Sequence, residues 1–157
     1  MGEDFLPDAE FPIDPKWGDM IADVVPNVFN VLIVSKRVRD ILQSEDVSDV
    51  EYLPFVILDK KGRIKSKDYC VANLIGSVDC LDAANSVFKD DPLEKGQIID
   101  IECLNIIKEK VPEDKKLFRL EQRRHLFIIR NDLLQRLQGD EITGLETYEM
   151  GSRVFIP

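Results

Sequence analysis

The stretch Tyr69–Ser86, which reads YCVANLIGSVDCLDAANS, decides most of what can be inferred about the fold of this chain. Its first six residues form a run that is typical of a buried strand. Small polar residues and two carboxylates, Asp79 and Asp82, come next. We predict a short helix over Asp79–Phe88, because two alanines favour helical backbone and Asp79 stands where a side chain would cap the first turn. A strand followed by a short helix indicates a mixed fold.

Sequence patterns on both sides of this stretch predict further elements. Ser35 can cap a helix whose apolar positions recur at helical spacing, and Asn131 can cap a final helix that ends at Gly139. A helical turn is predicted at 19–25, before a proline. A hairpin loop is expected at 59–62, where a glycine takes the positive φ. Strands are predicted over Phe29–Val34, Glu51–Leu58, Ile64–Leu74, Ile98–Leu104, Leu117–Leu120 and Leu126–Ile129.

These elements predict an α+β fold with a mainly antiparallel sheet and short packed helices. With 157 residues, of which 44% are apolar, the chain is long enough for one compact domain with a real core. We assign that domain to residues 19–157. Residues 1–18 contain three prolines and several acids, and we predict that they form an extended arm. A shift of 95 positions aligns the strand and helix near Ser35 with those near Asn131. Either two related strand–helix–strand units or a chance similarity in the spacing of apolar residues explains this alignment.

The net charge of −9 limits the partners that the chain can attract. Nucleic acid and anionic lipid would be approached against repulsion, whereas a basic protein would be attracted. The same charge also serves solubility in many acidic proteins. No apolar run is long enough to span a bilayer and no secretory signal is visible, so we expect a soluble cytoplasmic protein that binds neither nucleic acid nor membrane. One local group of cations is interpreted as a solvated hairpin tip: Lys115, Lys116, Arg123 and Arg124.

Candidate catalytic groups are sparse. His125 is the only histidine and has no patterned serine or cysteine partner, so we interpret it as an exposed polar residue. Three cysteines without a Cys-x-x-Cys pair favour reduced thiols over a disulfide or a zinc site. Asp79 and Asp82 are open to three interpretations: a helix cap, a divalent-ion site with further acids, or the paired carboxylates of a hydrolase. We favour the cap for Asp79, and we expect no metal, no cofactor and no enzymatic activity.

Five short segments occur in a fixed order between residues 23 and 146. They are Ile33–Ser35 with Val38 and Leu42; Tyr52–Pro54; Asn73 with Val78–Asp82 and Ser86; Leu117–Leu120; and Ile142–Glu146 with Tyr148. In this order and spacing they resemble the bacterial immunity protein family eleven, formerly a domain of unknown function. Members of that family accompany polymorphic toxins used in competition between bacterial cells. The family often has an aromatic soon after Gly144-Leu145, whereas Glu146 and Thr147 come before Tyr148 here.

The resemblance implies a small cytoplasmic antitoxin that binds and neutralises a cognate toxin domain through a stoichiometric protein–protein interface. A basic toxin, such as a nuclease, would complement the acidic charge of the chain. The residues predicted to contact it are Asp82, Asp90, Asp91 and Glu94. The family-motif residues that we interpret as structural are Asn73, Asp79, Ser86, Arg119 and Gly144. Two other functions remain open, namely a non-catalytic scaffold or regulatory domain, and a hydrolase that uses Asp79 and Asp82.

Overall fold

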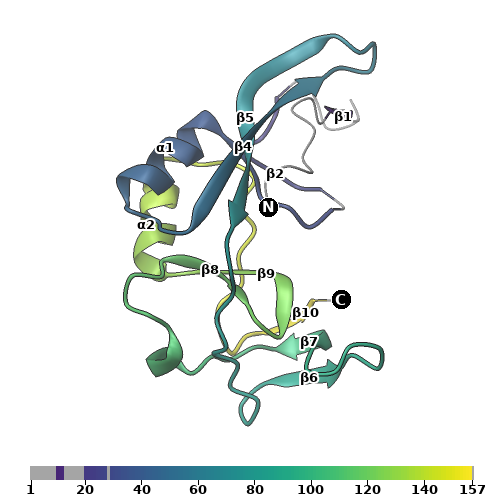
Figure 1. Ribbon diagram of the computed structural model, residues 1–157. Coiled ribbons are helices and arrows are strands. Elements are labelled where there is room, and N and C mark those ends of the chain that lie inside the picture. Colours follow the sequence, from purple (N-terminus) through teal and green to yellow (C-terminus); the bar gives the residue numbers. More distant parts are fainter. Residues whose placement is uncertain (1–9, 13–19, 28, 157) are drawn as a thin grey trace. The chain divides into compact units, whose positions relative to one another are not determined.

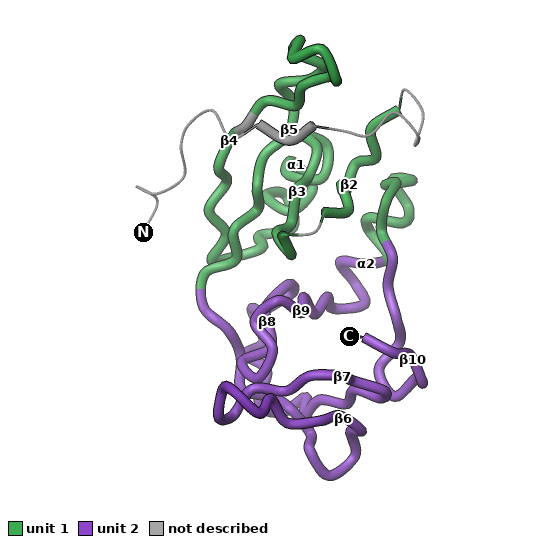
Figure 2. The backbone as a smooth tube through the Cα atoms, turned by 90° about the vertical axis from the view of Figure 1, so that its right-hand side faces the viewer, with its two compact units in different colours: residues 1–75, 135–145 green, residues 76–134, 146–157 purple. Residues whose placement is uncertain are grey.

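The computed structural model describes residues 10–12, 20–27 and 29–156. The chain divides into two compact units, which Figure 2 shows in different colours. Unit 1 takes residues 1–75 and 135–145, and unit 2 takes residues 76–134 and 146–157. Most of the arm predicted at 1–18 lies outside the described residues. The domain boundary at residue 19 stays a prediction.

Unit 1 is built on a five-stranded sheet. Its order is β1 (Glu10–Pro12), β4 (Val50–Leu58), β5 (Ile64–Leu74), β3 (Ile33–Ser35) and β2 (Val24–Val25). The pair β1–β4 is parallel and the other pairs are antiparallel. Figure 1 shows β4 and β5 as a long hairpin. It turns at Asp59, whose carboxylate accepts hydrogen bonds from the backbone of Lys61 and Arg63, and Gly62 has the expected positive φ, 72°. The predicted hairpin is confirmed.

Both helices of the described chain follow a strand directly. α1 (Lys36–Ser44) is capped as predicted, because the Val38 N–H donates to the Ser35 hydroxyl at 3.4 Å. The residues of α1 that are buried are Val38, Ile41 and Leu42. α2 (Asn131–Gly139) forms where the sequence predicted a helix. Asn131 is its first residue and not its cap, because the first helical hydrogen bond runs from the Leu134 N–H to the Arg130 carbonyl. The predicted α+β fold with short helices and mainly antiparallel strands is therefore confirmed.

Unit 2 contains a three-stranded antiparallel sheet and a separate antiparallel hairpin. The sheet has the order β10 (Arg153–Ile156), β7 (Ile98–Cys103), β6 (Val87–Asp90), and the hairpin consists of β8 (Leu117–Leu120) and β9 (Arg123–Ile129). A 3₁₀ turn, η2 (Lys108–Lys110), lies between β7 and β8 in the sequence. The buried core of this unit consists of Cys80, Ile98, Ile101, Phe118, Leu120 and Ile128.

The helix predicted over Asp79–Phe88 is wrong. Leu81 instead forms a bridge with Ile106, and the Asp82 N–H donates to the Asn105 carbonyl at 3.0 Å. The chain then turns and continues as β6. Backbone groups that pair with a distant segment cannot also make the local hydrogen bonds of a helix, so tertiary pairing overrides the helical preference of the two alanines.

Two smaller predictions also need correction. The helical turn expected at 19–25 is absent from residues 20–25, where β2 pairs with β3 instead. β7 does not alternate regularly, because Asp100 has a φ of +47° and the register with β6 shifts beside it. As a result Ile98 and Ile101, three positions apart, are both buried. The 95-residue repeat holds for strand and helix only, since no strand follows α2 at 142–146 as β4 follows α1.

Asp23 joins three parts of unit 1 that are far apart in the sequence. Its carboxylate accepts hydrogen bonds from the Ser35 hydroxyl at 2.8 Å and from the backbone N–H and hydroxyl of Thr143 at 3.1 and 3.0 Å. Arg37 lies 3.5 Å from the same carboxylate. Burial raises the pKa of Asp23, but the hydrogen bonds from Ser35 and Thr143 outweigh burial, so the pKa lies below its ordinary value. We call this arrangement the Asp23 node.

Gly144 packs directly against the Asp23 node. The Val24 N–H donates to the carbonyl of Thr143 at 3.0 Å, which brings the two chain segments together. Gly144 has a φ of +81°, and a Cβ placed there would lie 2.1 Å from the Val24 carbonyl oxygen. Only glycine satisfies both the backbone conformation and the close approach without strain. Its interpretation as a structural residue has this physical basis.

We expect Asp23→Asn to lower the free energy of unfolding by about 1–3 kcal/mol at neutral pH, because it weakens several charge-assisted hydrogen bonds. The pKa of Asp23 is lower in the folded state than its ordinary value of 3.8. The ionised carboxylate therefore contributes its full share to the free energy of unfolding well above pH 3.8, and this share is lost as the pH falls through the folded-state pKa. Urea unfolding at neutral pH and at about pH 3 should show that the difference between wild type and variant shrinks in acid. Asp46→Asn is the control, since Asp46 is exposed and should change stability by less than about 0.5 kcal/mol. A difference that does not vary with pH would contradict this role of the ionised carboxylate.

We expect Gly144→Ala to lower the free energy of unfolding by about 2–4 kcal/mol, because it combines an unfavourable positive φ with a steric clash. Gly62→Ala is a matched control: Gly62 also has a positive φ, +72°, but a Cβ there would meet open space. The difference between the two variants in thermal or urea unfolding isolates the clash with Val24. Equal destabilisation would mean that the two segments are not packed as closely as described.

Candidate functional site

Three of the four predicted partner-binding residues lie together on the β6–β7 hairpin of unit 2. Asp90 is the last residue of β6 and pairs with Ile98, while Asp91 and Glu94 belong to the connecting loop. Asp82 belongs to the turn before β6 and hydrogen-bonds to the segment after β7. The hairpin therefore separates Asp82, which is at its open end, from the other three acids, which are at its tip. We call Asp90–Gly96 the acidic tip.

The acidic tip is held in one conformation by its own hydrogen bonds. One carboxylate oxygen of Asp91 accepts from the N–H of Leu93 at 2.7 Å and from that of Glu94 at 3.2 Å. The Asp91 N–H donates to the Gln97 carbonyl, and the Gln97 N–H donates to the Glu94 carbonyl. Gly96 supplies the positive φ, +86°, that closes the loop. Asp91 thus has a structural role in addition to its charge.

The base of the acidic tip is bound to the turn between β8 and β9. The Gln97 side chain donates to the Glu121 carbonyl at 3.1 Å, and the Ile98 N–H donates to the Gln122 carbonyl at 2.9 Å. Arg123 donates to the Ile98 carbonyl at 3.0 Å. These bonds join two hairpins of the same unit, so the acidic tip projects from a rigid base.

The acidic tip carries an excess of negative charge. It contains three carboxylates and one cation, Lys95. Lys89, just before it, is already paired with Asp100 at 3.0 Å. Within the part of the chain that the structure describes, Asp90, Asp91 and Glu94 form no ion pair. Arg124 also senses this charge: the hydrogen bond that Arg124 donates to Glu121 is the main cause that raises the pKa of Arg124, and the field of Glu94 raises it further.

The family-motif residues of unit 2 hold backbone segments together. Asp79 accepts a hydrogen bond from the Gln122 side chain at 2.6 Å, next to a parallel bridge between Val78 and Leu120. The Ser86 hydroxyl accepts from the Asn105 N–H at 2.8 Å and donates to the carbonyl of the same residue.

The other motif residues also contact neighbouring strands. Arg119 lies over the ring of Phe127, its cross-strand neighbour, at 5.5 Å from the centroid. In unit 1, Asn73 donates to Glu51 on the paired strand at 3.4 Å. These contacts, together with the close packing of Gly144, join neighbouring segments, and the structural role of the motif residues stays a prediction.

The carboxylates that suggested a hydrolase or a metal site make separate interactions. Asp79 binds Gln122, and Asp82 accepts from the backbone N–H and side-chain amide of Asn85 at 3.3 and 2.8 Å. Among the described residues, no three His, Cys, Asp or Glu side chains are grouped so that they could hold a metal ion. His125 is exposed on β9. The three cysteines are free thiols.

The predicted basic group is divided between different contacts. Arg123 binds the Ile98 carbonyl, and Arg124 pairs with Glu121 at 2.9 Å. Lys115 and Lys116 come before β8 and are only half-buried. Arg123 therefore links the β8–β9 hairpin to β7, whereas Arg124 pairs within its own hairpin.

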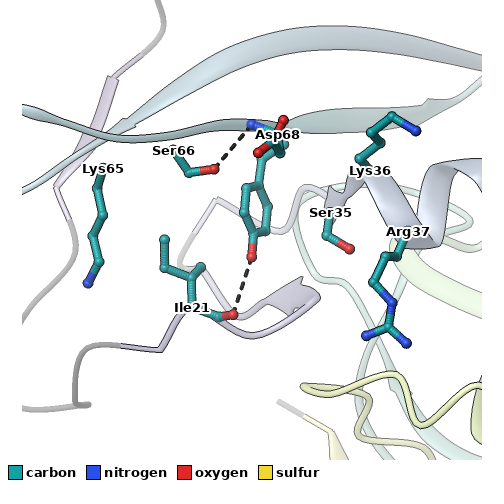
Figure 3. A pocket seen from close by; sticks show the side chains of 8 residues that line it. Ile21, Ser35, Lys36, Arg37, Lys65, Ser66 and Asp68 are labelled. Atoms are coloured by element: carbon teal, nitrogen blue, oxygen red, sulfur yellow. Dashed lines mark hydrogen bonds between the residues drawn. The ribbon is translucent and has the colours of Figure 1, made fainter.

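A hollow of about 550 Å³ opens in unit 1 beside the start of α1. Figure 3 shows Arg37 on one side of it and Lys65 on the other. The Tyr69 hydroxyl donates to the Ile21 carbonyl at 3.2 Å. Sequence patterns did not predict this hollow, because its lining comes from three separate segments. Its lining residues are Ile21, Ser35, Lys36, Arg37, Lys65, Ser66, Asp68 and Tyr69.

The polar groups of this hollow are mostly engaged already. Lys36 is paired with Asp40. Arg37 is bound to the Asp23 node and donates to the Asp140 carbonyl at 2.7 Å. The Ser35 hydroxyl donates to the Asp23 carboxylate, whose lowered pKa makes it a weak base for the activation of a nucleophile. The contacts of the hollow thus stabilise unit 1, and we assign it no catalytic role.

Neither helix in the described part of the chain is long and apolar enough to cross a membrane. The family model that matches this sequence is described as Immunity protein family (Imm11), and the match covers residues 3–152. No curated protein matches the chain. The resemblance inferred from the five short segments is confirmed.

Proposed function

Because the chain belongs to the Imm11 immunity protein family, we propose that it is a cytoplasmic antitoxin, which binds and neutralises a cognate toxin domain by stoichiometric association. The toxin would belong to a polymorphic toxin system used in competition between bacterial cells. Inhibition of this kind requires a complementary surface and no chemistry. The chain would therefore act as a binding protein and not as an enzyme.

The acidic tip is the observation that best supports a basic partner. It concentrates carboxylates that form no ion pair with the described residues, in a chain with a net charge of −9. Complementary charge accelerates the encounter of two proteins, by factors that fall steeply with ionic strength. Because the tip is held by its own hydrogen bonds, little conformational freedom would be lost on binding. We propose that Asp90, Asp91 and Glu94 attract and contact the toxin.

Asp82 has a different place in this proposal. Its carboxylate shapes the turn before β6, at the other end of the hairpin. A standard interface buries roughly 1,600 Å² in total, which is large enough to reach both ends of a short hairpin. The contact predicted for Asp82 stays a prediction, and we place the centre of the interface at the tip.

The proposal is tested by co-expression in a bacterial host with the C-terminal domain of the adjacent large open reading frame as the toxin. We expect growth to be restored and a one-to-one complex to elute from size-exclusion chromatography. The triple variant Asp90→Asn/Asp91→Asn/Glu94→Gln should slow association about tenfold at low salt, because it removes three charges and keeps the acceptor oxygen that forms the loop. Stopped-flow or surface-based kinetics at several salt concentrations measures this.

A matched control changes the same number of charges elsewhere. Asp46, Asp68 and Glu141 are exposed acids of unit 1, and Asp46→Asn/Asp68→Asn/Glu141→Gln has the same net charge as the first variant. Its association rate should stay within about twofold to threefold of wild type, because only the total charge of the chain changes. An equal loss in both variants would show that net charge, and not the acidic tip, attracts the toxin. Toxicity without rescue or binding would refute the antitoxin function itself.

A further inference from the structure

Leu93, at the centre of the acidic tip, is the most exposed large apolar side chain of the described residues. It is 95% exposed. Scattered exposed leucines are ordinary on protein surfaces, so exposure by itself indicates little. Leu93 differs because carboxylates flank it on both sides and because its backbone is fixed. An ordered, exposed apolar side chain with carboxylates beside it resembles the apolar core and polar rim of a protein–protein interface.

The conformation of Leu93 follows from two neighbours. Pro92 limits the backbone before it, and the Asp91 carboxylate accepts the Leu93 N–H at 2.7 Å. The loop is closed on the other side by the bond from the Gln97 N–H to the Glu94 carbonyl at 3.1 Å. The side chain is thus presented to solvent by a loop that is already ordered, which reduces the entropy cost of binding.

The charges around Leu93 indicate what covers it. Two copies of this chain would bring two acidic tips together, and each tip has an excess of carboxylates over its single lysine. Like charges at a close interface oppose association, so a second copy is disfavoured. A basic surface with an apolar depression satisfies both features, because it buries the leucine and pairs with the carboxylates around it.

We propose that Leu93 is the apolar anchor of the interface, and that it inserts into an apolar pocket with a basic rim on the cognate toxin. This inference rests on the proposed antitoxin function. Burial of the leucine side chain away from water increases the affinity, and the surrounding acids raise the association rate and orient the partner. Removal of the leucine side chain therefore mainly raises the dissociation rate, whereas removal of the charges mainly lowers the association rate.

The test compares the toxin affinity of Leu93→Ala with that of Ile64→Ala. Ile64 lies at the start of β5 in unit 1 and is 58% exposed, so both variants remove an exposed branched apolar side chain. We expect Leu93→Ala to weaken binding at least about tenfold, through faster dissociation, and Ile64→Ala to leave it within about twofold. Leu93→Met should bind within about threefold of wild type, because it keeps an apolar side chain of similar volume.

The outcomes separate the inference from the function on which it rests. Wild-type affinity in Leu93→Ala, while wild type binds the toxin domain, would overturn the anchor and leave the antitoxin function intact. Failure of wild type to bind or rescue would refute the function and the anchor with it. Light scattering of the protein alone provides a further check: a dimer that Leu93→Ala dissociates would assign the tip to a second copy and overturn the proposal.

Discussion

The Asp23 carboxylate is the constraint on which the arrangement of unit 1 depends. It accepts hydrogen bonds from Ser35, which caps α1, and from Thr143, which lies 120 residues away in the sequence. A half-buried carboxylate is stable only if donors surround it, and here the donors come from segments that must be in place together. The close packing of Gly144 on Val24 follows from the same arrangement. One charged group therefore connects β2, the start of α1 and the segment after α2.

Unit 2 is organised mainly by backbone pairing. Its central segment, residues 78–86, pairs with β8 on one side and with the residues after β7 on the other. Cys80 is fully buried between these pairings, where burial is the main cause of its raised pKa. The motif residues Asp79 and Ser86 satisfy backbone and amide groups along this segment. One of the five segments that carry the family resemblance thus organises this unit.

The acidic tip combines an internally hydrogen-bonded loop with exposed negative charge. Asp91 gives one oxygen to the backbone of the loop and still contributes its charge to the surface. The carbonyl groups of Glu121 and Gln122 accept hydrogen bonds from the base of the acidic tip, so the turn of the β8–β9 hairpin supports the β6–β7 hairpin. A surface prepared in this way loses little entropy when it meets a partner. This organisation supports the proposed binding function.

The sequence by itself determined the elements whose signals are local. The cap at Ser35 and the turn at Asp59–Gly62 depend on residues within a few positions of each other, and both were predicted correctly. The extent of α2 was predicted as well, although Asn131 lies inside the helix and not at the cap position. The composition indicated an acidic chain, and the motifs identified the family. The tertiary structure alone decided the rest. It replaced the predicted helix with extended backbone, because residues 81 and 82 pair with residues 105 and 106. It also separated Asp82 from the other acids and brought Asp23 to its distant donors. Such contacts depend on packing between segments that are far apart in the sequence, so local residue spacing cannot predict them.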